Sequence, residues 1–293
     1  MTGTKEYGKI RQLAEQYDIG AILYMAPLSS GSTCHAWRID SEKGSWILRK
    51  CHSIMSAADE YALSEALFQT DITPVILHTK EGERFVYGDN GVFNLQTRIE
   101  GEPLTDVNED IMRKTAAAFV TVHRMLKDAK IHLHFNDRFG LHSLSWENIT
   151  KAADVPGTAA LIKELDELYR FESDTGECIH GDAGIWNILL ENGEIRIIDF
   201  GEARMGNTYL DHAGFLVSAL EQKDPETAAA LVKCYMDASA KAGRQLDPAI
   251  LHKAVRLWLL RGVFAALAFE KHRSLIESIM KTNDLFHQVF REL

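Results

Sequence analysis

The spacing of hydrophobic and polar residues changes once along this chain, near residue 100. Between residues 20 and 100, apolar residues alternate with polar ones or form short runs bounded by turn residues, a pattern that predicts β-strands. One stretch of helical spacing, Ala57 to Gln69, interrupts these strands, and Ser56 with Asp59 is expected to form the capping box at its start. The expected strands are residues 22–27, 34–39, 45–51, 84–87 and 92–99.

The remainder of the chain has mostly helical spacing. Ile111 to Lys127 is amphipathic, with apolar residues on one face. Asp224-Pro225 and Asp247-Pro248 each place a capping side chain before a proline in the first helical turn. Gly243 is expected to end the first of these helices, and the second is expected to extend to about His272. The order of the elements predicts an α+β fold with two lobes.

A hairpin interrupts the helical part. Two apolar runs, residues 188–190 and 195–198, flank Asn192-Gly193, which is the strongest short signal for a two-residue turn. Pairing about this turn sets residue 190 against 195, 188 against 197 and 187 against 198. Asn187 and Asp199 therefore leave one end of the hairpin together, on strands about 5 Å apart, with Asp182 on the loop just before it. Two carboxylates and an amide oxygen are ligands suited to Mg²⁺ that is shared with nucleotide phosphates.

The order of these residues carries a resemblance. His180-Gly181-Asp182, with Asn187 five residues after the aspartate, precedes Ile198-Asp199-Phe200-Gly201. This arrangement resembles the aminoglycoside phosphotransferase/choline kinase-like family, small-molecule kinases with a protein-kinase-like fold. The resemblance implies that Asp182 is the catalytic base toward the acceptor hydroxyl, that Asn187 and Asp199 hold Mg²⁺, and that His180 braces the loop.

The same resemblance implies how the lobes are built. Residues 1–98 would form an N-lobe with a five-stranded antiparallel sheet and a helix, and residues 99–293 a mostly helical C-lobe with the acceptor-binding helices. In the N-lobe, the loop that contains Ser30, Gly31 and Ser32 would cover the nucleotide phosphates, with one glycine in place of the usual three.

A cation on the third strand is expected to contact the α- and β-phosphates. The family's cation follows a short apolar run, which selects Arg49, and the planar guanidinium suits phosphate oxygens. Lys50 is the alternative, and because strand residues alternate in direction only one of the two can face the nucleotide. Glu60 is the expected carboxylate partner of the cation, with Glu65 as the second choice.

Residues 96–104 resemble the family's hinge between the lobes. Adenine would contact backbone groups of Thr97 and Ile99 there, and side chains contribute so little that ATP and GTP remain equally possible donors. Farther along, Asp211 matches a family aspartate that braces the catalytic loop. His123 is expected to be a core or surface histidine and not a catalyst.

Composition narrows the class of protein. The net charge of −10 divides into −3 on residues 1–101 and −7 on residues 102–293, so the basic patch that nucleic-acid binding needs is absent. An acidic larger part would attract a cationic acceptor, although ordinary solubility explains the charge equally well. No apolar run reaches the ~18 residues of a membrane span, and the N-terminus lacks the apolar core of a signal peptide. Four scattered cysteines predict reduced thiols and a cytoplasmic protein.

The residues together predict a phosphotransferase that uses Mg²⁺ and ATP or GTP to phosphorylate a hydroxyl of a small molecule. The acceptor is expected to be an aminoglycoside or an amino alcohol, with homoserine or methylthioribose as alternatives. Protein kinase activity is disfavoured because Gly181 replaces the arginine of protein kinases and Asp211 follows Gly201 too closely for an activation segment. A catalytically idle nucleotide-binding protein on the same scaffold is a further alternative. The sequence leaves the oligomeric state open.

Overall fold

The computed structural model of the protein describes residues 2–28, 35–133, 170–171, 176–268 and 273–293. Its residues form two compact units, Met1–Gly101 and Glu102–Leu293. The boundary expected from the sequence, between residues 98 and 99, lies three residues before this division.

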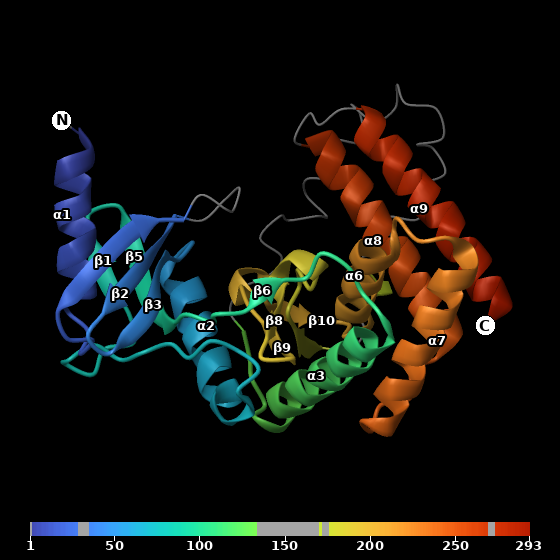
Figure 1. Ribbon diagram of the computed structural model, residues 1–293, viewed down its shortest axis with the longest axis horizontal. Helices are drawn as coiled ribbons and strands as arrows, with labels where there is room; N and C mark the ends of the chain where they lie inside the picture. Colours follow the sequence, from blue (N-terminus) through green and yellow to red (C-terminus); the bar gives the residue numbers. More distant parts are fainter. Residues whose placement is uncertain (1, 29–34, 134–169, 172–175, 269–272) are drawn as a thin grey trace. The chain divides into compact units, whose positions relative to one another are not determined.

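The first unit is a five-stranded antiparallel sheet with the order β1-β2-β3-β5-β4, as the sequence predicts. Helices α1 and α2 lie on opposite faces of this sheet (Figure 1). Apolar residues of α1 pack with Leu48, Phe93 and Leu95 in the core of the unit. The elements are α1 (Thr2–Ala14), β1 (Ile22–Pro27), β2 (Ala36–Ser41), β3 (Gly44–Lys50), α2 (Ile54–Leu67), a 3₁₀ turn η1 (Phe68–Thr70), β4 (Val86–Gly88) and β5 (Gly91–Thr97).

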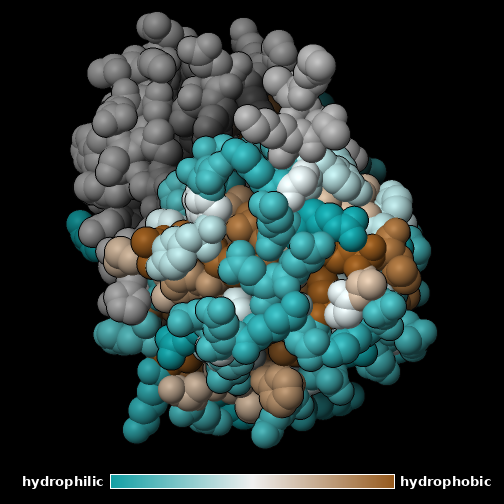
Figure 2. All heavy atoms as spheres, turned by 90° about the vertical axis from the view of Figure 1, so that its left-hand side faces the viewer, coloured by the Kyte–Doolittle hydropathy of each residue, from teal (hydrophilic) through white to brown (hydrophobic). Residues whose placement is uncertain are grey.

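The structure corrects the predicted start of α2. Its N-cap is Ser53, whose side chain accepts a hydrogen bond from the Ser56 N–H at 3.0 Å. Ser56 and Asp59 are buried within the helix, at 3% and 5% exposure, so the capping box expected from them is wrong by about one turn. Helix α1 was not among the expected elements at all. The face of this unit that Figure 2 shows is largely hydrophilic, with smaller apolar areas between.

The second unit combines short strands with five long helices among its described residues (Figure 1). Helix α3 packs against α7, and α8 packs between α6 and α9. The elements are β6 (Glu102–Pro103), α3 (Glu109–Asp128), β7 (Glu177–Ile179), the 3₁₀ turn η2 (Ile185–Asn187), β8 (Ile188–Glu191), β9 (Glu194–Ile197), the 3₁₀ turn η3 (Phe200–Glu202), β10 (Arg204–Gly206), α6 (Tyr209–Leu220), α7 (Pro225–Lys241), α8 (Pro248–Ala268) and α9 (Arg273–Glu292).

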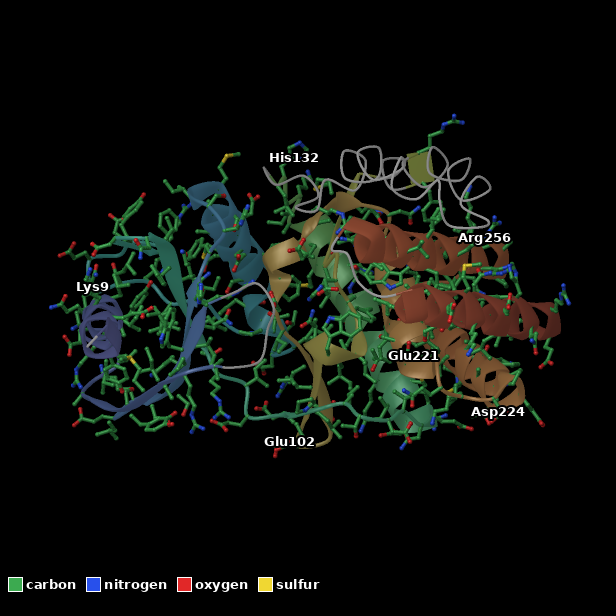
Figure 3. All side chains as sticks on the ribbon, turned by 90° about the horizontal axis from the view of Figure 1, so that it is seen from above. Lys9, Glu102, His132, Glu221, Asp224 and Arg256 are labelled. Carbon is green, nitrogen blue, oxygen red and sulfur yellow. The ribbon has the colours of Figure 1, made fainter. Side chains whose placement is uncertain are left out.

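The predicted caps of α7 and α8 are confirmed. The Asp224 carboxylate accepts a hydrogen bond from the Thr227 N–H at 2.9 Å, and Figure 3 shows Asp224 at the start of α7. Asp247 caps α8 in the same way, through the Ala249 and Ile250 N–H groups. Gly243 follows α7 with φ 104°, a left-handed conformation that suits glycine after a helix end. The expected end of α8, near His272, lies outside the described residues.

The hairpin of β8 and β9 has the predicted register. Ile188 pairs with Ile197 and Leu190 with Ile195. The turn residues Asn192 and Gly193 both have positive φ, 53° and 82°, which is the geometry of a type I′ turn. The Ile198 N–H donates to the Asn187 carbonyl at 3.0 Å, so the pairing continues to the residue before Asp199.

The composition predicts that no segment spans a membrane and that the cysteines are reduced thiols. No helix in the described part of the chain is long and apolar enough to cross a membrane. Cys51, Cys178 and Cys234 are thiols and form no disulfide among the described residues, while Cys34 lies outside them.

Candidate active site

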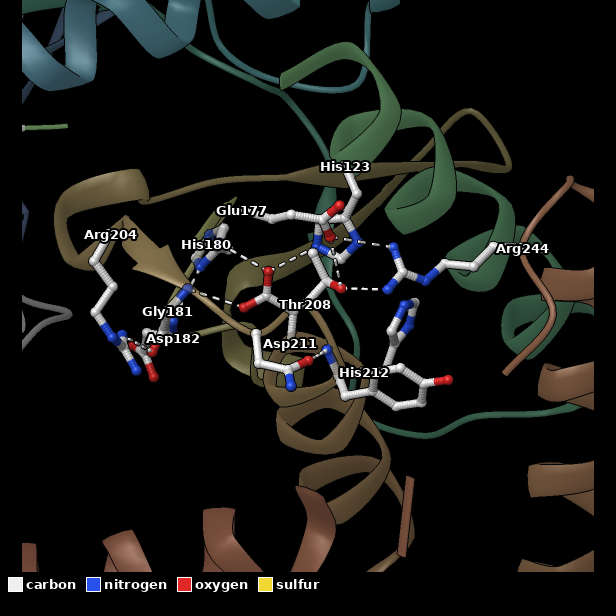
Figure 4. Close-up of polar contacts among 12 residues, drawn as sticks. His123, Glu177, His180, Gly181, Asp182, Arg204, Thr208, Asp211, His212 and Arg244 are labelled. Carbon is white, nitrogen blue, oxygen red and sulfur yellow. Dashed lines mark hydrogen bonds and ion pairs between the residues drawn. The ribbon is translucent and has the colours of Figure 1, made fainter. Parts of the chain in front are cut away.

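Asp211 anchors the loop that carries Asp182 (Figure 4). It lies in the first turn of α6 with no solvent exposure. Its two carboxylate oxygens accept hydrogen bonds from the backbone N–H groups of His180 and Gly181, at 2.8 and 2.9 Å. The His123 Nε2 on α3 lies 2.8 Å from the same carboxylate. Asp211 thus holds the loop through backbone atoms, and His123 is a buried partner of Asp211.

The environment of Asp211 keeps its carboxylate charged. Burial by itself would raise the pKa of this group, but the hydrogen bond and the charge interaction with His123, with smaller contributions from His180 and the Gly181 N–H, outweigh burial and lower the pKa to about 2. A charged carboxylate makes stronger hydrogen bonds than a neutral one. The position of the loop is therefore fixed by charge-assisted bonds that persist at neutral pH.

His180 braces the loop from a second side. Its Nε2 lies 2.9 Å from the Ile198 carbonyl oxygen, which can only accept a hydrogen bond, so Nε2 carries the proton. Its Nδ1 accepts a hydrogen bond from the Asp182 N–H at 3.3 Å. The imidazole therefore ties the Asp182 backbone to the end of the hairpin, and its ring packs on Phe200 at 4.6 Å between centroids.

Gly181 allows a close approach that no other residue would permit. Its φ is 82°, and a Cβ atom at this position would overlap the Glu202 carbonyl oxygen and the Arg204 guanidinium. Its own carbonyl oxygen accepts hydrogen bonds from Arg204 at 3.1 Å and from Arg261 at 2.8 Å. Both arginines are buried, at 3% and 8% exposure. Neither was singled out in the sequence, because a side chain that binds a backbone carbonyl leaves no motif.

Asp182 and Asn187 are joined directly. The Asn187 Nδ2 donates to the Asp182 carbonyl oxygen at 2.8 Å and to Asp182 Oδ2 at 3.1 Å. Since a backbone carbonyl only accepts hydrogen bonds, the nitrogen side of the carboxamide faces Asp182 and the Asn187 Oδ1 faces away from it. An amide oxygen presented in this way fits the oxygen donor set that Mg²⁺ requires.

Asp199 begins the turn after β9. It adopts a left-handed conformation (φ 64°, ψ 67°) that few residues other than glycine and Asn or Asp tolerate. Its Oδ1 accepts a hydrogen bond from the Gly201 N–H at 3.3 Å, and its side chain is exposed. Because Asn187 pairs with Ile198, Asp199 leaves the hairpin at the same end as Asn187.

Trp186 is a further residue of this site that the sequence did not indicate. It lies in η2 between Asp182 and β8, and it is 53% exposed. Its indole Nε1 donates to Asp182 Oδ2 at 3.2 Å. The tryptophan and Asn187 therefore both donate to the same oxygen of Asp182.

In the first unit, Arg49 and Glu60 form a buried ion pair. The guanidinium lies 2.8 Å from Glu60 Oε2, and both residues are 6% exposed. Asn94 on β5 also donates to Glu60 Oε2, at 3.2 Å. Glu65, the second choice for this carboxylate, is exposed on α2.

Lys50 points away from this pair. As the alternation of β3 requires, it lies on the opposite face of the sheet, where it lines a cavity of about 340 Å³ with Lys9 and Trp37. Of the two candidate cations, the structure therefore places Arg49 beside the helix carboxylate.

The other residues expected near the nucleotide are less fully described. The Thr97 N–H donates to the Val75 carbonyl at 2.9 Å, so it already has a partner within the first unit. Thr97 and Ile99 lie at the end of β5 and just after it. Ser30, Gly31 and Ser32 lie outside the described residues.

The model of the phosphotransferase enzyme family matches residues 25–246 of the chain. The chain belongs to this family, the aminoglycoside phosphotransferase/choline kinase-like family. Its members are small-molecule kinases, which agrees with the resemblance carried by the His-Gly-Asp and Ile-Asp-Phe-Gly motifs.

Solved structures show that this family member has the bilobal kinase-like fold. An amicoumacin kinase is similar with a TM-score of 0.71 and 15% identity, over 100% of this chain and 96% of that chain. A microcompartment-associated aminopropanol kinase follows with 0.68 and 17%, over 96% and 94%. Choline kinase from Cryptosporidium parvum has 0.63 and 14%, over 98% and 96%. A search of curated protein sequences finds no significant match. At these identities the likeness establishes the fold.

Proposed function

We propose that this protein is an Mg²⁺-dependent phosphotransferase that moves the γ-phosphate of ATP or GTP to a hydroxyl of a small, preferably cationic molecule. The observation that supports it best is the arrangement around Asp182. Asn187 orients the Asp182 carboxylate, and the hairpin brings Asn187 and Asp199 to the same end. A base and two oxygen ligands so arranged are what phosphoryl transfer to an alcohol requires.

Asp182 is the proposed catalytic base. Its Oδ2 accepts hydrogen bonds from two N–H donors, Trp186 and Asn187, which hold the carboxylate in one orientation. The second oxygen, Oδ1, is then directed to the acceptor hydroxyl and takes its proton as the oxygen attacks phosphorus. General-base assistance of this kind contributes about 10² to 10⁴ in rate.

Asn187 Oδ1 and Asp199 are the proposed Mg²⁺ ligands. When bound, the metal would neutralise charge on the nucleotide phosphates and align them. Asp199 is suited to this role because its left-handed turn presents an exposed carboxylate beside the hairpin end.

The proposed nucleotide contacts come from the first unit. Arg49, held by Glu60, would donate to the α- and β-phosphates, and Ser30, Gly31 and Ser32 would cover them. Since the Thr97 N–H is occupied, we expect adenine to be recognised by the Thr97 carbonyl oxygen and by Ile99.

The proposed acceptor is an amino alcohol or an aminoglycoside. The second unit carries −7 of the net charge of −10, which favours cationic molecules. The compared structures include kinases named for aminopropanol and choline, both amino alcohols. Homoserine and methylthioribose belong in the same screen, because no contact in the described site excludes them.

The test is transfer of labelled phosphate from ATP and from GTP to aminoglycosides, choline, aminopropanol, homoserine, methylthioribose and a generic protein. Reactions with and without chelator measure the dependence on Mg²⁺, and Asp182→Asn serves as the inactive control. Transfer to a small molecule that is lost in the variant supports the proposal. Transfer to protein alone contradicts it, and tight nucleotide binding without transfer to any acceptor would indicate the idle scaffold.

A further inference from the structure

Trp186 combines exposure with a direct contact to the proposed base. Slightly more than half of its surface is open, at 53% exposure, although large aromatic residues usually bury most of theirs. Its Nε1 donates to Asp182 Oδ2 at 3.2 Å, so the indole ring lies beside the carboxylate. The turn that carries it is anchored to α6, because the Ile185 N–H donates to Ser218 Oγ at 2.8 Å.

Gly184 shows that the position of the indole is built into the loop. Its backbone angles, φ −76° and ψ 164°, are open to any residue, so the glycine is not required by the backbone. A Cβ atom at this position would instead overlap three atoms of the six-membered ring of Trp186. The absence of a side chain at residue 184 therefore lets the ring lie flat on the chain beside Asp182.

We propose that Trp186 is the specificity-determining residue for the acceptor, with its open ring face as the platform for a cationic amine. This inference rests on the proposed function, because it assigns Asp182 to the acceptor hydroxyl. One side of the ring rests on Gly184, so the other side receives the ligand. Tryptophan is the aromatic side chain that attracts cations best, within about 6 Å of the ring.

The geometry also selects the spacing between the amine and the hydroxyl. The indole nitrogen is within hydrogen-bond distance of the carboxylate that accepts the hydroxyl proton. An acceptor that contacts both must carry its cation within a few bonds of its hydroxyl. The favoured class is therefore the short amino alcohol, whether as a free small molecule or as part of an aminosugar.

Choline and its uncharged isostere, in which carbon replaces the quaternary nitrogen, test the platform directly. Cation–π strengths correspond to about two- to thirty-fold in binding, so wild type should bind choline more tightly than the isostere by that factor. Trp186→Leu should abolish this preference by weakening choline binding alone. Gly184→Ala should have the same effect with the tryptophan still present, because the ring is displaced. Trp186→Phe keeps an aromatic face but loses the indole N–H, so it should keep most of the preference while its kcat falls.

Calorimetry of both ligands, together with KM and kcat for choline, separates this inference from the proposed function. A Trp186-dependent preference without any phosphate transfer would support the platform and contradict the kinase proposal. Phosphate transfer with a preference that survives in Trp186→Leu and in Gly184→Ala would overturn the platform and leave the kinase proposal intact. Equal binding of choline and its isostere by wild type would overturn the platform as well.

Discussion

Replacement of Gly181 by alanine tests whether the loop that carries Asp182 depends on the close approach seen in the structure. Gly181 has φ 82°, and an added Cβ would overlap the Glu202 carbonyl oxygen and the Arg204 side chain. A left-handed conformation costs a residue with a Cβ about 1–2 kcal/mol. Overpacking against rigid neighbours adds about 1–3 kcal/mol, and here one neighbour is backbone. The expected loss of unfolding free energy is therefore about 2–5 kcal/mol.

Gly193 is a matched control for this substitution. It has the same φ of 82° in the turn of the adjacent hairpin, but a Cβ there would meet nothing within 4 Å. Gly193→Ala should therefore cost only the conformational part, about 1–2 kcal/mol. The difference between the two variants isolates the overlap at Gly181 from the backbone strain that both share.

Urea unfolding followed by fluorescence and by circular dichroism gives both free energies, provided that the two signals report one transition. Gly181→Ala should also lose most phosphate transfer, because shifting the loop moves Asp182, whereas Gly193→Ala should retain it. If the two variants were equally stable, the close packing of Gly181 against Glu202 and Arg204 would be refuted.

Three further predictions concern the site and its support. Asp182→Asn should lower turnover by about 10² or more with nearly unchanged nucleotide affinity, and turnover like that of wild type in the pure variant would contradict its role as base. Asp199→Asn should weaken nucleotide binding in calorimetry with Mg²⁺ but not without it, and identical binding in both conditions would remove Asp199 from the metal site. Burial, followed by the charges of His123 and Arg244, holds the pKa of His212 well below 6.5. Below about pH 6.5 the unfolded chain takes up a proton on His212, whereas the folded chain does not. The free energy of unfolding should therefore fall by about 1.4 kcal/mol for each unit by which the pH is lowered in this range. His212→Asn should flatten this part of the curve of unfolding free energy against pH, and an unchanged slope would show that His212 is not its source.

The hairpin was predictable because its signals are local. Asn192-Gly193 defines the turn, and the apolar runs on both sides leave one register that buries Ile188, Ile195 and Ile197. The position of Asn187 relative to Ile198 and Asp199 then follows by counting residues. The start of α2 was predicted wrongly because Ser53 and Ser56 are both good capping residues. The sequence alone does not show that Ser56 is buried within the helix, which leaves Ser53 as the cap.

The choice between Arg49 and Lys50 shows what alternation along a strand can decide. It requires the two side chains to face opposite sides of the sheet, but it does not say which side carries α2. In the structure, α1 covers the face that carries Lys50, and α2 covers the face that carries Arg49. The sequence could not assign the two faces because α1 was not among the expected elements. Its contribution to the core comes from Ile10, Leu13 and Ala14, too few apolar positions for a clear helical pattern.

The support of the loop that carries Asp182 was the least predictable part, because it acts through backbone atoms. Asp211 binds two backbone N–H groups from 30 and 31 residues away, and Arg261 binds the Gly181 carbonyl from 80 residues away. Every residue has such backbone groups, so the partner of an anchoring side chain leaves no trace in the sequence. The resemblance identified Asp211 by its position, while Arg204 and Arg261 required the fold. The motifs therefore identified His180 and Asp211 among the supporting residues, whereas the two arginines that bind the Gly181 carbonyl were identified only from the folded chain.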